Sequence, residues 1–106
     1  MAFKRVTKRI VTREVEVMVP IDGKAFDKAT LQVTFEILPS DELNKHQYDE
    51  AFFKRVVSDV KGYVDENEQP IEFSAASFAG LIGESFVRAA FTRAYMDITI
   101  AAPRGN

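Results

Sequence analysis

The sequence predicts a single α+β domain over residues 1–106, with an N-terminal antiparallel β-hairpin followed by a small bundle of about three helices. Two observations predict this class. In the first third of the chain apolar and polar residues alternate, which is the period of a half-buried strand. From residue 41 onward apolar residues recur at helical spacing instead. The expected organisation is a basic, partly flexible arm (1–10), a hairpin (11–38), a helical part (41–100) and a frayed tail (101–106).

The predicted hairpin has strands over 11–19 and 30–38, and the turn segment "IDGKAFDKA" (21–29) separates them, with Asp22–Gly23 as its tight point. On the first strand one face carries the apolar residues Val11, Val15, Val17 and Val19, and Arg13 is the exception on that face. On the second strand the apolar face carries Leu31, Val33, Phe35 and Ile37. Pro20 and Pro39 are expected to end the first and second strands, because proline cannot donate to the ladder.

The first predicted helix begins after Ser40 or Asp41, whose side chains can accept from free backbone N–H groups, and ends at Gly62. Its apolar stripe is Phe52, Phe53, Val56, Val57 and Val60. A second, short helix over 75–82 is expected between the N-cap Ser74 and Gly83.

The last predicted helix runs from about Glu84 to Thr99. Its stripe is Phe86, Val87, Ala90, Phe91, Ala94, Tyr95 and Ile98, wide enough for a helix that covers a core.

The stretch "GYVDENEQPIEFS" (62–74) resembles a calcium loop, because Asp65, Asn67 and Gln69 alternate as oxygen ligands do. An EF-hand loop then needs Gly at position 6 and a bidentate Glu at position 12. Here these positions are Pro70 and Ala76, so the cage would stay open. The segment is therefore expected to shape the fold by setting the angle between the helices on either side of it, and no metal site is predicted.

No motif predicts catalysis or a cofactor site. The chain has no Cys, and its one His, His46, lies in a polar run without a nucleophile or an orienting acid nearby in sequence. Gly80 and Gly83 lack the lysine and spacing of a phosphate loop. The protein is expected to be neither an enzyme nor a cofactor binder.

Charge is distributed unevenly. The whole chain carries −2, but residues 1–13 hold five basic side chains and no acid. Such an arm can touch nucleic acid, although it is short and nearly free of aromatics, and a solvated terminus is the favoured interpretation. The sequence has neither a secretion signal nor a membrane-spanning run, so an intracellular protein without membrane contact is expected.

Aromatic stripes on the helices are the remaining candidates for function. Most of these side chains are expected in the core, but a small domain with two wide stripes leaves apolar surface for a protein partner. The predicted partner-binding residues lie on the last two helices: Phe78, Leu81, Ile82, Phe86, Phe91, Tyr95 and Ile98.

Residues 50–97 resemble the tail assembly chaperones of long-tailed bacteriophages. The resemblance rests on three stretches of this chain: "FFKRVVSDVKG", "VDENEQPIEFS" and "AFTRAY" in the last predicted helix. The matching residues are Phe52, Phe53, Val56, Val57, Asp59, Gly62, Val64, Asp65, Glu66, Pro70, Phe73, Ser74, Leu81, Ala90, Ala94 and Tyr95. This chain has Val60 and Lys61 where the family carries a tryptophan, and "LIGES" replaces a proline-bearing break.

The resemblance implies a non-structural helper in the host cell cytoplasm that is absent from the mature virion. Such proteins bind the tape measure protein, keep it soluble and help to recruit the major tail protein, and some of them self-associate. Two alternatives remain open: a structural tail or head-tail joining protein, and a DNA-binding regulator that uses the basic arm.

Overall fold

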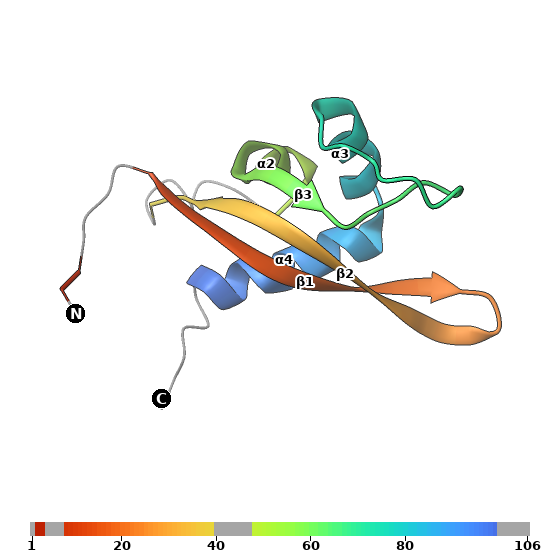
Figure 1. The fold of residues 1–106 in the computed structure, drawn as a ribbon. Coiled ribbons are helices and arrows are strands. Elements are labelled where there is room, and N and C mark those ends of the chain that lie inside the picture. Colours follow the sequence, from red (N-terminus) through yellow and green to blue (C-terminus); the bar gives the residue numbers. More distant parts are fainter. Residues whose placement is uncertain (1, 4–7, 40–47, 100–106) are drawn as a thin grey trace.

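The computed structural model describes residues 2–3, 8–39 and 48–99 and has an α+β fold. A long hairpin of β1 (Arg9–Ile21) and β2 (Lys24–Ile37) is followed by α2 (Glu50–Val56), β3 (Val57–Lys61), α3 (Ala75–Ile82) and α4 (Ser85–Thr99). The three strands form one antiparallel sheet in the order β1-β2-β3. The helices α2 and α4 pack against the sheet, α3 packs against these two helices, and the hairpin tip projects past them (Figure 1).

The hairpin is longer than the sequence predicted. A two-residue turn at Asp22–Gly23 joins the strands directly, and Gly23 supplies the left-handed backbone (φ 81°) that such a turn needs. Pro20 does not end β1. The register shifts by one residue between Val19 and Ile21, and β1 is an edge strand, so a bulge accommodates the missing N–H.

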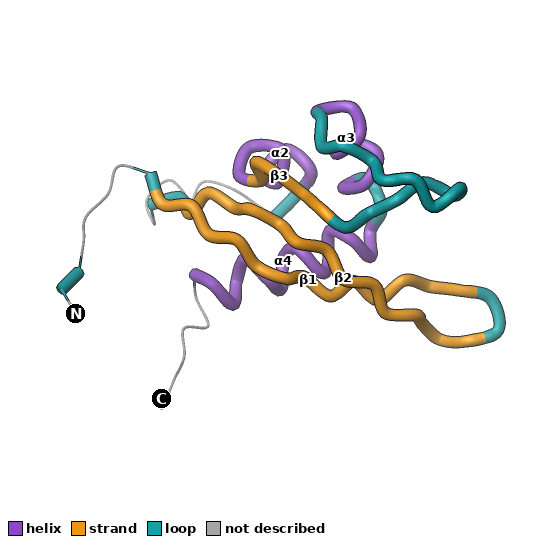
Figure 2. Tube along the Cα trace, viewed as in Figure 1, coloured by secondary structure: helices purple, strands orange, loops and turns teal. Residues whose placement is uncertain are grey.

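The first predicted helix is wrong in its second half. The helix α2 has only seven residues, begins at the N-cap Asp49 and ends at Val56. Val57 and Val60 then lie in β3, which pairs with β2, and Gly62 follows a strand rather than a helix (Figure 2). The expected caps Ser40 and Asp41 lie outside the described residues, as do half of the basic arm (1 and 4–7) and the whole 101–106 tail.

A one-residue register shift explains why β3 has the spacing of a helix. Phe35 pairs with Val57 but Thr34 pairs with Asp59, so Ser58 is the extra residue of a bulge. Val57 and Val60, three residues apart, are consequently both buried.

The later helices agree with the sequence. Ser74 caps α3 by accepting from the Ser77 backbone N–H (3.0 Å), and the Ser77 hydroxyl accepts from the Ser74 N–H (2.9 Å) in a capping box. Gly83 ends α3, and α4 begins at Ser85.

One apolar core lies between the sheet and the helices. Its buried members come from all six elements and from Leu38: Val15, Val17, Leu31, Val33, Phe35, Leu38, Phe52, Phe53, Val56, Val57, Val60, Phe78, Ile82, Val87, Ala90, Phe91 and Tyr95. Among strands, α4 packs mainly against β1.

Tyr95 ties α4 to the end of β2. Its hydroxyl accepts from the buried Leu38 N–H and donates to the Glu36 carbonyl, both at 3.0 Å. Its ring packs edge-on against Phe35 and Phe52, with centroids 5.6 and 5.1 Å away. Burial raises the pKa of Tyr95, because the phenolate form is poorly solvated there.

Candidate functional site

Four of the seven predicted partner-binding residues are core residues. Phe78, Ile82, Phe91 and Tyr95 are at most 3% exposed, so the folded domain does not offer them to a partner. The other three, Leu81, Phe86 and Ile98, are half-buried and remain at the surface. The predicted surface is thus corrected to these three side chains and their neighbours.

Two rows of side chains along α4 explain this division. The row Val87, Phe91 and Tyr95 enters the core. The adjacent row runs at four-residue spacing through Phe86, Ala90, Ala94 and Ile98, and it lies one step around the helix. Since α4 packs under the edge strand β1, this second row faces the border of the sheet.

A groove of about 520 Å³ runs between β1 and α4. Its strand wall is formed by residues 13–16 and its helix wall by Ala90, Arg93, Ala94, Asp97 and Ile98. Consecutive strand side chains point to opposite faces, so a groove that touches four in a row follows the strand's edge. The other edge of β1 is occupied by β2, and the groove therefore opens at the unpaired edge; we name it the edge groove.

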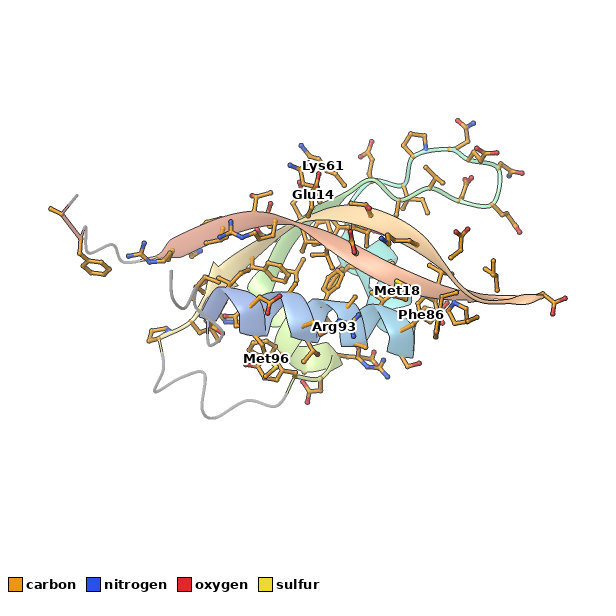
Figure 3. The ribbon with its side chains drawn as sticks, turned by 90° about the horizontal axis from the view of Figure 1, so that it is seen from below. Glu14, Met18, Lys61, Phe86, Arg93 and Met96 are labelled. Carbon is orange, nitrogen blue, oxygen red and sulfur yellow. The ribbon has the colours of Figure 1, made fainter. Side chains whose placement is uncertain are left out.

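A second hollow, of about 560 Å³, continues from the edge groove towards the hairpin tip. It shares Glu16 and Arg93 with the edge groove and adds Met18, Phe26, Phe86 and Ala89. Figure 3 shows Met18 and Phe86 beside each other at the N-terminal half of α4, with Arg93 further along the helix. We name it the tip hollow.

Met18 and Phe26 were missed by the sequence analysis. They are 37% and 53% exposed, large values for such apolar side chains. Phe26 fell within the predicted turn, where a lone phenylalanine surrounded by polar residues was the available signal. By alternation Met18 falls on the same strand face as Glu14 and Glu16, the face that the sequence predicts to be solvent-exposed.

Two arginines of the edge groove have no acidic partner in the part of the chain that the structure describes. Among the described residues, no carboxylate lies within ion-pair distance of Arg13 or Arg93. The Arg13 guanidinium donates to the neighbouring Thr12 carbonyl (3.2 Å). On the opposite face of β1, Glu14 and Glu16 are exposed, and Glu16 reaches only the exposed Lys28 (3.8 Å).

The segment 62–74 shapes the fold. The Asp65 side chain accepts from the backbone N–H groups of Asn67 (2.8 Å) and Gln69 (3.0 Å), so its oxygen closes a turn. The Tyr63 hydroxyl donates to the Ser77 carbonyl (2.9 Å) and fixes α3 against this turn. The segment sets the position of α3 relative to β3, not relative to a preceding helix as predicted.

Leu81 belongs to a separate surface, a shallow hollow over α3 that also includes Tyr63 and Ile71. The predicted residues therefore divide between this hollow and the grooves beside β1.

Metal and membrane sites are not evident in the part of the chain that the structure describes. No group of three or more His, Cys, Asp or Glu side chains there could hold a metal ion. None of the helices within 50–99 has the length and apolar character of a membrane span. His46 lies outside the described residues.

The chain matches no protein-family model, no curated protein and no solved structure. The edge groove and the tip hollow together present apolar and charged side chains of β1, β2 and α4 at the surface.

Proposed function

We propose that this protein is a non-enzymatic tail assembly chaperone of a long-tailed bacteriophage, which binds the tape measure protein and keeps it soluble. The single observation that carries the proposal is the order of residues in 52–95, from Phe52–Phe53 through "VDENEQPIEFS" to Ala94–Tyr95. The proposal places the protein in the host cell cytoplasm and outside the mature virion. The major tail protein and further copies of the chain are its other proposed partners.

The apolar tip hollow supports this proposal. A tape measure protein is long, helical and rich in apolar residues, and an amphipathic helix buries such residues in an apolar groove. Met18, Phe26 and Phe86 line a hollow of about 560 Å³ at the projecting end of the hairpin. Exposed Met18 and Phe26 beside the half-buried Phe86 form an apolar surface of the kind that binds proteins.

Co-expression with the tape measure protein encoded beside it tests the function. We expect more soluble tape measure protein with the chain than without it, and a loss of this gain in a Met18→Ser/Phe26→Ser variant. Both positions are exposed, so the variant should stay folded. Val64→Ser is the matched control, because Val64 is 49% exposed but lies in the turn before α3.

Equal solubility of the tape measure protein with and without this chain contradicts the chaperone function. Mass spectrometry of purified particles separates the proposal from a structural role, because a chaperone is absent from them and a tail or joining protein is present.

A further inference from the structure

The sheet has a vacant strand position beside β1. The strand β1 spans 13 residues, and only β2 pairs with it among the described elements. The helix α4 packs under this edge strand rather than under the middle of the sheet. The row of α4 side chains at four-residue spacing, from Phe86 to Ile98, therefore faces the position that a fourth strand would take.

The edge groove has dimensions that suit a strand. From residue 90 to residue 98, the helix wall of the groove, an α-helix rises about 12 Å, which is close to the length of four extended residues such as 13–16 of the strand wall. The floor is lined by Ala90 and Ala94, whose small side chains leave room above the helix. Unpaired backbone groups along the edge of β1 supply the hydrogen-bonding wall.

We propose that the edge groove binds an extended segment of a partner protein, which adds to β1 as a fourth strand. Main-chain hydrogen bonds to the β1 edge hold the segment, and its inward side chains cover Ala94 and Ile98. This inference does not depend on which protein supplies the strand, and the tip hollow takes no part in it.

Charge defines the chemistry of the segment. Opposite Glu14 and Glu16, on the outer face of β1, the added strand carries lysine or arginine. Opposite Arg13, on the helix face, it carries a carboxylate, because Arg13 and Arg93 line the groove without an acidic partner among the described residues. Opposite Val15 and Val17 it carries apolar, β-branched residues.

The same charges disfavour a second copy of β1 whose symmetry axis lies at residues 13–15 of the edge groove. A symmetric antiparallel pair centred on residue 13 places two Arg13 side chains opposite each other. Centring on residue 14 opposes two Glu14 side chains, and centring on residue 15 opposes Glu14 and Glu16. Like charges directly opposite destabilise a strand pair. An inward-pointing charge such as Arg13 also protects an edge from indiscriminate pairing.

The probe is a synthetic seven-residue peptide in which valine alternates with lysine, with one glutamate at the position that lies opposite Arg13. NMR of the full chain follows its binding, and hydrogen exchange follows the β1 amides. We expect saturable binding that slows exchange along β1. Peptides N-methylated at either alternate set of residues serve as controls, and we expect one of them not to bind, because it lacks the donors to the β1 edge.

Charge reversal tests the register. Arg13→Glu should weaken binding by about fivefold, the upper range for a cross-strand pair, and a peptide with lysine in place of its glutamate should restore it. Lys61→Glu makes the same charge change on the other edge strand (Figure 3) and should leave binding unchanged.

Three outcomes overturn the inference: no saturable binding by the peptide, equal binding by both N-methylated peptides, or shifts confined to Met18 and Phe26. Protection of β1 that grows with protein concentration without peptide, together with dimers in sedimentation, would identify a second copy as the occupant and also refute it.

Discussion

Replacing Tyr95 by phenylalanine isolates the hydroxyl that joins the last helix to the sheet. The ring and its edge-on contacts stay, while the bonds to the Leu38 N–H and the Glu36 carbonyl disappear. Each net hydrogen bond contributes about 1 kcal/mol, and the buried Leu38 donor is left without a partner. We expect the free energy of unfolding to fall by about 2 kcal/mol, which lowers Tm by about 8 °C in a domain of this size.

Urea titration followed by circular dichroism measures this loss. Tyr63→Phe is the matched control, because it removes one bond, to the Ser77 carbonyl, at a partly buried site. It should cost about 1 kcal/mol or less. If Tyr95→Phe is no more destabilising than Tyr63→Phe, the hydroxyl does not anchor α4 and the reasoning fails.

Alkaline pH gives a second readout of the same group. Burial raises the pKa of Tyr95 in the folded chain, whereas an unfolded tyrosine ionises near its ordinary pKa of about 10. As the pH rises through this value the unfolded chain releases a proton that the folded chain keeps, so stability falls. The Tyr95→Phe variant should lack the part of this stability loss that comes from Tyr95. An identical loss of stability at alkaline pH in both proteins would contradict the burial argument.

Three further predictions concern single positions. Gly62→Ala forces left-handed backbone (φ 97°) on a side chain and should cost about 1–2 kcal/mol in urea titration; an unchanged midpoint would contradict this. Asp49→Ala removes the cap that accepts from the Phe52 N–H (2.9 Å) and should cost about 1 kcal/mol, whereas Asp49→Asn should retain most of it. The hydrogen bond from Arg55 holds the pKa of Glu36 below its usual range. Wild-type stability relative to Glu36→Gln should therefore shrink as pH falls below about 4.3, and a constant difference would refute the linkage.

The hairpin, α3 and α4 were predictable from the sequence because their local signals agree with their tertiary contacts. Alternation in β1 and β2 matches the burial of Val15, Val17, Leu31 and Val33. Ser74 caps α3 as its position before an apolar run suggested. In these segments the spacing of apolar residues in the sequence equals the spacing of the residues that face the core.

The strand β3 was not predictable from periodicity. Its bulge at Ser58 brings Val57 and Val60 to the buried side with a spacing of three, which is a helical spacing. Two valines favour a strand there, because valine is β-branched, but the helical turn that precedes them hides this signal. Only pairing with β2, a non-local contact, decides the outcome.

The candidate site was predictable in part. The sequence located an apolar face on α4, but it could not separate the row that enters the core from the row beside it. That choice depends on α4 lying under the edge strand β1. Phe26 was missed because its exposure follows from the length of the hairpin beyond the helices, which a two-residue turn makes possible.

The contact of α4 with β1 and the end of β2 also governs how the chain folds during synthesis. Until Tyr95 is available, Leu38 lacks its partner and Phe35 lacks the rings that cover it. Contacts between segments so far apart in sequence form late, since a long loop must close first. The nascent domain should therefore stay protease-sensitive on the ribosome until Thr99 has emerged and then become resistant in one step. Resistance of a stalled chain that ends before Ser85 would contradict this order.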